Sequence, residues 1–81
     1  MSRKIKFIWD FRGPDAKKIA THHCIHLNEY IKKEKLSLQV VGDEKISEIH
    51  HIAFMLVDEV SMKKHRDALQ PHRGQVYTEK T

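Results

Sequence analysis

The chain has a single cysteine, no long hydrophobic run and very few glycines and prolines. One cysteine, Cys24, excludes an internal disulfide and favours a reducing compartment. No stretch approaches the roughly 18 apolar residues of a membrane-spanning helix, so no membrane association is expected. The basic N-terminus alternates apolar with charged residues and lacks a small-residue cleavage site, so no signal peptide is predicted. Together these absences predict a cytoplasmic, soluble protein.

The composition that is present suits one small globular domain spanning residues 1–81. Of the 81 residues, 40% are hydrophobic and 32% are charged, which is typical of a folded chain and not of a disordered tail. The formal net charge of +4 and the isoelectric point near 9.3 suggest nucleic-acid binding at first. Lysine and arginine are spread along the whole chain, however, and a solvated surface explains them better.

Hydrophobic periodicity predicts six elements along the chain. Alternation of apolar residues, as in KIKFIWDF, indicates strands, and apolar residues every three or four positions indicate helices. Gly13 and Pro14 separate the first strand from the first helix, and Pro71 ends the second helix. The predicted order is strand 4–11, helix 15–35, strand 36–42, strand 49–57, helix 58–70 and strand 74–78.

This order predicts a ferredoxin-like α+β sandwich, in which two helices cover one face of a four-stranded antiparallel sheet. The first and third strands are then central, which agrees with their high apolar content. We expect Phe7, Trp9 and Phe54 to point toward the helices. The side chains expected on the opposite side, called the outer face below, are Lys6, Ile8, Asp10, Ser37, Gln39, Val41, His51, Ala53, Met55 and Val57.

The outer face is predicted to be half apolar, and no element remains to cover it. Exposed patches of that kind are rare on monomers, so we predict a homodimer through the open sheet face; a monomer with a poorly covered face is the alternative. RNA-binding domains of this fold stack bases on outward aromatic residues of the central strands. None is expected to point outward here, so nucleic-acid binding is not predicted.

Three histidines crowd the stretch THHCIHLNEY in the first predicted helix. His23 falls near the centre of the apolar helix face, and His65 falls in the buried stripe of the second helix, so the two could approach each other, joined by His50. One interpretation makes them core histidines that bond to the backbone or to Tyr30. The other makes them a shared polar site suited to proton transfer, pH sensing or metal binding.

The remaining two histidines of that stretch, His22 and His26, are spaced to chelate one ion from the helix surface. Two imidazoles are fewer than the three or four protein ligands that zinc sites use. Cys24 points about 200° away from His22 around the helix and cannot easily join the pair. We therefore predict adventitious metal binding at His22 and His26, and no cofactor.

The turn WDFRGPDA brings Asp10, Arg12 and Gly13 to a helix N-terminus, which favours an anion. A plain Gly-Pro turn with a solvated Arg12 is the alternative. The layout of DFRGPDAKKIA followed by AFMLVDEVSMKKHRDAL resembles ACT-type regulatory modules, and equally small bacterial domains of ferredoxin-like fold and uncharacterised function. The ACT resemblance implies a small ligand near this turn, commonly at a dimer interface. Acylphosphatases need an asparagine on a strand and heavy-metal domains need two cysteines at this turn, and the chain has neither.

Two functions remain open. The first is a non-catalytic ligand-binding or protein-interaction module, which takes a small polar or anionic ligand near the turn or uses the sheet face. The second is a small dimeric α/β-barrel-type enzyme with histidine as general acid or base, either His51 beside Asp10 or His23 with His65. The predicted ligand-binding residues are Asp10, Arg12, Gly13, His23, His51 and His65.

Overall fold

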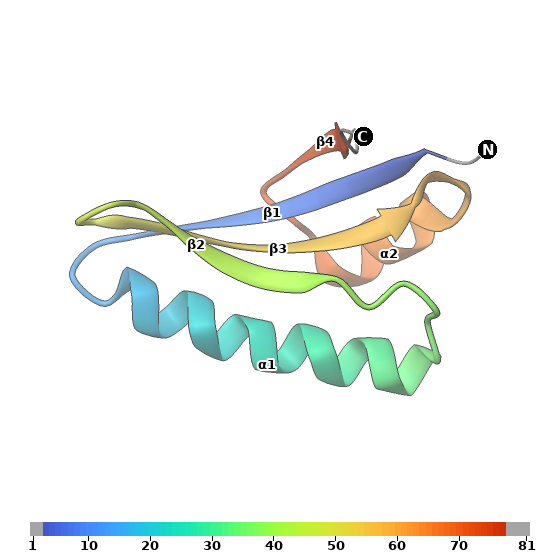
Figure 1. Cartoon of the computed structure of the whole chain (residues 1–81), viewed down its shortest axis with the longest axis horizontal. Helices are drawn as coiled ribbons and strands as arrows, with labels where there is room; N and C mark the ends of the chain where they lie inside the picture. The colour runs from blue at the N-terminus through green and yellow to red at the C-terminus, as the bar shows by residue number, and fades with distance from the viewer. Residues whose placement is uncertain (1–2, 78–81) are drawn as a thin grey trace.

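The computed structural model describes residues 3–77, which form a four-stranded sheet with two helices on one face (Figure 1). The elements are β1 (Lys4–Arg12), α1 (Ala16–Glu34), β2 (Val41–Ser47), β3 (His50–Asp58), a 3-10 turn (Glu59–Ser61), α2 (Met62–Leu69) and β4 (Arg73–Tyr77). The strand order is β2-β3-β1-β4, and all neighbours are antiparallel. The predicted ferredoxin-like arrangement, with β1 and β3 in the centre, is confirmed.

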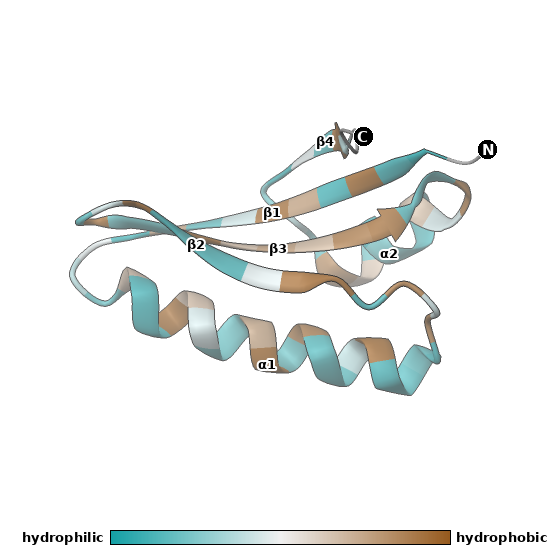
Figure 2. Cartoon of the chain, viewed as in Figure 1, coloured by the Kyte–Doolittle hydropathy of each residue, from teal (hydrophilic) through white to brown (hydrophobic). Residues whose placement is uncertain are grey.

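The alternation of β1 decides which face of the sheet is buried. Phe7 and Trp9 are only 1% and 3% exposed and share one core with Leu27 and other apolar residues of α1. Trp9 Nε1 donates a hydrogen bond to the carbonyl of Leu69 at 3.3 Å, which holds α2 on the same face. Apolar bands run along the middle of β1 and β3, whereas α1 alternates between polar and apolar positions (Figure 2). Burial of these bands is the main favourable contribution to folding.

The prediction for the second strand is wrong in its position. The strand was predicted over 36–42, but residues 36–40 form a loop after α1, and β2 occupies Val41–Ser47, which overlaps the prediction only at residues 41–42. The β2–β3 turn instead spans Glu48 and Ile49. The strand was missed because β2 is an exposed edge strand, rich in charge at Asp43, Glu44 and Lys45. Edge strands of this kind carry charges that discourage pairing with other chains and show no apolar alternation.

The predicted facing of β3 is also wrong, by one residue. Phe7 lies opposite Met55 and Trp9 lies opposite Ala53, and directly paired residues project to the same side of a sheet. The helix-facing set is therefore His51, Ala53, Met55 and Val57, and the outer set is His50, Ile52, Phe54 and Leu56. Both sets are largely apolar, so the pattern does not distinguish them, and a shift of one residue reverses every side chain. Val41 lies opposite Met55 and also faces inward, against the prediction.

The outer face has no covering layer, yet its apolar side chains are largely shielded within one chain. Ile8, Ile52 and Leu56 are 2%, 4% and 5% exposed. The Phe54 ring packs so closely over Gly42 that an added Cβ there would lie 2.7 Å from its tip. Phe54 is an outward aromatic residue on a central strand, against the prediction, and the ammonium group of Lys6 lies 4.6 Å from the centre of its ring. The homodimer through this face and the absence of nucleic-acid binding stay predictions.

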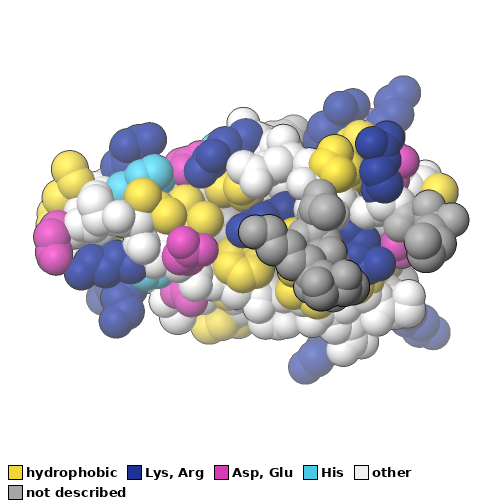
Figure 3. All heavy atoms as spheres, turned by 45° about the horizontal axis from the view of Figure 1, so that its top comes forward, with side chains coloured by type: hydrophobic (Ala, Val, Ile, Leu, Met, Phe, Trp, Pro, Cys, Tyr) yellow, Lys and Arg dark blue, Asp and Glu magenta, His cyan; other side chains and the backbone are white. Residues whose placement is uncertain are grey.

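Basic side chains do not gather on the face seen in Figure 3. Lysine and arginine are scattered over its described part, with acidic side chains between them. Within residues 3–77, no helix is long and apolar enough to cross a membrane. The predictions made for residues 1–2 and 78–81, including the end of the last strand, lie outside the described residues.

Candidate ligand-binding site

The turn after β1 is built for chain reversal. Gly13 has a φ of 111°, a conformation that favours glycine. Its N–H donates to the carbonyl of Ile49 at 2.7 Å and is therefore not free for a ligand. Arg12 is exposed and forms no ion pair within the described residues. The structure thus does not gather Asp10, Arg12 and Gly13 around one anion position.

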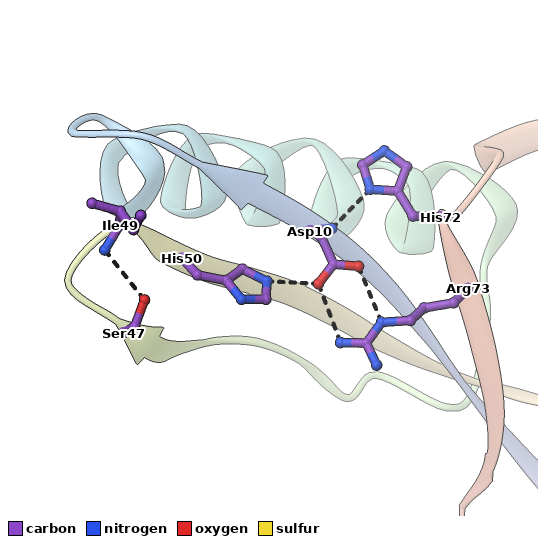
Figure 4. Close-up of polar contacts among 6 residues, drawn as sticks. All are labelled: Asp10, Ser47, Ile49, His50, His72 and Arg73. Carbon is purple, nitrogen blue, oxygen red and sulfur yellow. Dashed lines mark hydrogen bonds and ion pairs between the residues drawn. The ribbon is translucent and has the colours of Figure 1, made fainter.

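Asp10 of β1 is held by side chains from β3 and β4, and we call this group the Asp10 clamp (Asp10, His50 and Arg73; Figure 4). His50 Nε2 donates to Asp10 Oδ1 at 2.7 Å. Arg73 donates from Nε to Oδ2 at 3.0 Å and from Nη2 to Oδ1 at 3.1 Å. The backbone N–H of Asp10 donates to His72 Nδ1 at 2.8 Å. The clamp joins β1, β3 and β4 at one end of the sheet.

The Asp10 clamp keeps its carboxylate ionised. Partial burial by itself would raise the pKa of Asp10, but the hydrogen bonds and charges of Arg73 and His50 outweigh it, so the pKa lies below its ordinary value of 3.8. Arg73 balances the charge through a two-point contact, which is the strong geometry for an arginine–carboxylate pair. Both carboxylate oxygens are thereby occupied, and the clamp is primarily structural.

His51, which was expected beside Asp10, lies on the other side of the sheet. It is 6% exposed, and its Nε2 lies 3.2 Å from Asp43 Oδ2. The same oxygen accepts a hydrogen bond from the Thr21 hydroxyl at 3.1 Å. His51 therefore links β3 to β2 and α1, and the histidine that contacts Asp10 is its neighbour His50.

His23 and His65 do not form a shared site. His65 is 3% exposed, and its Nδ1 lies 2.7 Å from the Tyr30 hydroxyl. His23 lies beside Trp9 and Phe11, with ring centres 4.7 and 5.6 Å away. Seven residues of α1 separate His23 from Tyr30, roughly 10 Å along the helix. His50, expected near them, lies on the outer face.

Burial keeps both of these histidines neutral. It lowers the pKa of His23, with His26, His72 and His22 adding to the effect. It also lowers the pKa of His65, helped by Lys64 and opposed by Glu34. His65 Nδ1 can then accept from the Tyr30 hydroxyl, whereas His23 Nε2 is buried without a hydrogen-bond partner in the described part of the chain. His65 thus has the contacts of a core histidine, whereas His23 is partly buried beside Trp9 and Phe11.

Leucine at these two positions is expected to change stability in opposite directions. His23→Leu removes a buried nitrogen without a partner and should raise the free energy of unfolding by about 1 kcal/mol, whereas His65→Leu strands the Tyr30 hydroxyl and should lower it by about 1–2 kcal/mol. The gain from His23→Leu should grow as the pH falls below about 6.5, because the unfolded chain protonates His23 before the folded chain does. Urea unfolding at two pH values measures both. A stability loss in His23→Leu that does not depend on pH would contradict this assignment.

The remaining predicted ligands lie on the surface of α1. His22 and His26 are exposed, and their Nε2 atoms are 3.0 Å apart. Cys24 does not join them, because its thiol donates to the carbonyl of Gly42 at 3.2 Å; burial, with Asp43 nearby, raises its pKa. Among residues 3–77, no group of three or more His, Cys, Asp or Glu side chains is placed to hold a metal ion.

The sequence did not indicate a hollow of about 390 Å³ between α2 and β4, called the α2–β4 hollow. Its floor is formed by Ile5 and Phe7 of β1, which are 7% and 1% exposed. It is open because α2 has only eight residues and because Gly74 lies opposite Phe7 without a side chain. The residues lining it are Ile5, Phe7, Met62, Arg66, Pro71, His72, Arg73, Gly74, Gln75 and Val76.

Among the described residues, the charged side chains that line the α2–β4 hollow are two arginines, Arg66 and Arg73, and no acidic residue lines it. Arg66 is exposed, and its only ion pair in the described residues is a loose 3.8 Å contact with Asp67. His72 accepts from the backbone through Nδ1, so in the neutral ring the proton lies on Nε2 and can be donated. None of the six predicted ligand-binding residues lines this hollow.

No protein-family model matches the chain, and neither the curated proteins nor the solved structures contain a match to it. A function for this chain is therefore argued from the chemistry of its own residues.

Proposed function

We propose that the chain is a non-catalytic binding domain for a small anion with an apolar body, held in the α2–β4 hollow. The observation that carries the proposal is the pairing of an apolar floor, Ile5 and Phe7, with a rim that includes Arg66 and, within residues 3–77, no acidic residue. Ligand sites are typically apolar hollows of roughly 300–1,000 Å³ with a few polar groups that fix orientation. The volume of about 390 Å³ suits a ligand of one ring or a short branched chain.

The chemistry of the rim favours a carboxylate or phosphate over a neutral group. A guanidinium binds such oxygens through two parallel hydrogen bonds. Arg73 is engaged by Asp10, which leaves Arg66 as the cation for the ligand, supported by the His72 Nε2–H. The sequence predicted a small anionic ligand at the turn after β1. The proposed ligand belongs to the same class but binds in the α2–β4 hollow.

The test compares phenylacetate with phenylacetamide, which has the same shape without the charge. Amide NMR spectra of the protein should show phenylacetate perturbing residues of α2 and β4, with little response to phenylacetamide. Arg66→Met should weaken phenylacetate binding at least tenfold, about 1.4 kcal/mol. Arg12→Met, which removes the arginine of the turn, is the matched control and should bind as the unmodified chain does.

A second variant separates binding from folding. A Cβ at Gly74 would lie at ordinary contact distances, 3.6 Å from Ile5 and 3.7 Å from Phe7, and β-branched residues suit strands. Gly74→Val should therefore keep the fold, fill the hollow and abolish binding. Equal binding of the two probes, or perturbations around Arg12 that Arg12→Met removes, would overturn the proposal and return the site to the turn.

A histidine acid/base enzyme is the second candidate, and the Asp10–His50 contact at 2.7 Å is what favours it. A carboxylate that orients an imidazole is common in such enzymes. Arg73 occupies the same carboxylate, however, and neither Asp10 nor His50 lines the α2–β4 hollow. The binding domain is therefore preferred. A cytoplasmic location and a homodimer through the outer face remain predictions that accompany it.

A further inference from the structure

The histidine pair on α1 has the geometry of half a metal site. The 3.0 Å between His22 Nε2 and His26 Nε2 is a few tenths of an ångström shorter than the roughly 3.3–3.4 Å that separates two nitrogens bound to one tetrahedral zinc ion at about 2.0–2.1 Å. The two rings are nearly perpendicular, at 80°, and their Nε2 atoms face each other in a hydrogen bond, so the rings have to turn slightly for both lone pairs to meet at one ion. Little rearrangement is needed for both to reach one ion.

A neighbouring carboxylate sets one ring for metal binding. His26 Nδ1 lies 3.3 Å from Glu29 Oε1 in an exposed ion pair; because a carboxylate can only accept, this contact favours the tautomer with the proton on Nδ1. In the neutral ring its Nε2 then has a free lone pair. Metal-bound histidines almost always have such a partner on the other nitrogen. The proton that His22 Nε2 donates to His26 moves to His22 Nδ1, through water, when the ion binds.

Two ligands leave a zinc site half complete, since structural zinc takes four. The described residues supply no third histidine, cysteine or carboxylate in reach of the pair. Two exposed isoleucines lie beside the pair: Ile19 and Ile25 are 47% and 52% exposed, and each shares a surface hollow with His22, Asp15 and Lys18. Exposed apolar groups around an incomplete site point to a partner surface.

We propose that His22 and His26 form one half of a zinc site that a second copy of this chain completes with the same two residues. Four imidazoles then give the tetrahedral coordination that zinc prefers. The contact is made by the exposed face of α1 and is distinct from both the outer face of the sheet and the α2–β4 hollow. Isologous pairing of this kind is the commonest form of dimer.

Charge supports an antiparallel pairing of the two α1 helices. With the two-fold axis passing beside Cys24, midway between the histidines, His22 of one copy faces His26 of the other. The same axis places Asp15 of one copy opposite Lys33 of the other. The isoleucines flank the ion on both sides and exclude water from it.

The test uses untagged, chelator-treated protein in sedimentation velocity with increasing zinc. The chain should dimerise with one zinc ion for two chains, and His22→Ala and His26→Ala should each abolish this. Lys32→Ala, on the same helix outside the histidine face, is the matched control and should dimerise as the unmodified chain does. Cobalt in place of zinc should show the intense visible absorption of a tetrahedral ion.

Glu29→Gln provides a graded readout, because loss of such a carboxylate partner weakens metal binding about 10-fold or more. Two results would overturn the proposal. One is a chain that stays monomeric at every zinc concentration, including zinc bound one to one. The other is zinc-dependent association that persists in both alanine variants, which would place the zinc contact on another surface.

Discussion

Replacing Phe7 with alanine is expected to lower the free energy of unfolding by about 3–5 kcal/mol, the cost typical of removing a buried phenylalanine. Phe7 is 1% exposed and is among the largest fully buried side chains. It lies on a central strand, packs edge-on against Trp9 with ring centres 6.3 Å apart, and forms part of the floor of the α2–β4 hollow. Domains of this size are typically stable by only about 5–15 kcal/mol, so the variant should lose much of its stability.

Urea unfolding followed by circular dichroism measures this loss. Val60→Ala is the matched control, since Val60 is 88% exposed and such surface changes usually stay within about 0.5 kcal/mol. If Phe7→Ala does not fold, Phe7→Leu gives a smaller loss of the same sign. A loss below about 1 kcal/mol for the alanine variant would show that the core is not organised around this residue.

Asp10→Ala is expected to lower the free energy of unfolding at neutral pH by about 1–2 kcal/mol. The Asp10 side chain is 18% exposed and that of His50 is 14% exposed, so His50 loses its partner without ready access to water. Arg73 is 47% exposed and can turn to solvent, which limits the loss. Glu59→Ala is the control. It removes an ion pair between Glu59 and Arg3, whose side chains are 39% and 66% exposed, and such exposed pairs contribute only about 0–1 kcal/mol.

The effect of Asp10→Ala should depend on pH in a definite direction. The pKa of Asp10 is lower in the folded chain than its ordinary value of 3.8. Its contribution to stability is therefore fully present above that value and is lost as the pH falls through the lower pKa of the folded state. Unfolding measured at neutral pH and at about pH 3 should show the difference between variant and unmodified chain shrinking. An equal difference at both would assign the loss to packing and not to the ionised clamp.

The clamp shows what a one-residue error means for a site. The sequence predicted that His51 would lie beside Asp10, whereas His50 is the histidine that contacts Asp10. The correct residue types were recognised, but β3 is apolar on both faces and its pattern carries no information on its facing. Only the pairing of Phe7 with Met55, set by how the strands meet, places His50 with Asp10. The same shift moved Phe54 from the core to the outer face.

The sequence by itself determined the order of the elements, the central position of β1 and β3 and the inward face of β1. These follow from local periodicity and from breaks such as Gly13-Pro14, which are properties of neighbouring residues. The facing of β3, the position of β2 and the separation of His23 from His65 were decided only by the tertiary structure. So was the α2–β4 hollow, whose lining comes from residues 5, 7, 62, 66 and 71–76. Such features depend on contacts between distant segments, and local pattern does not encode which segments meet.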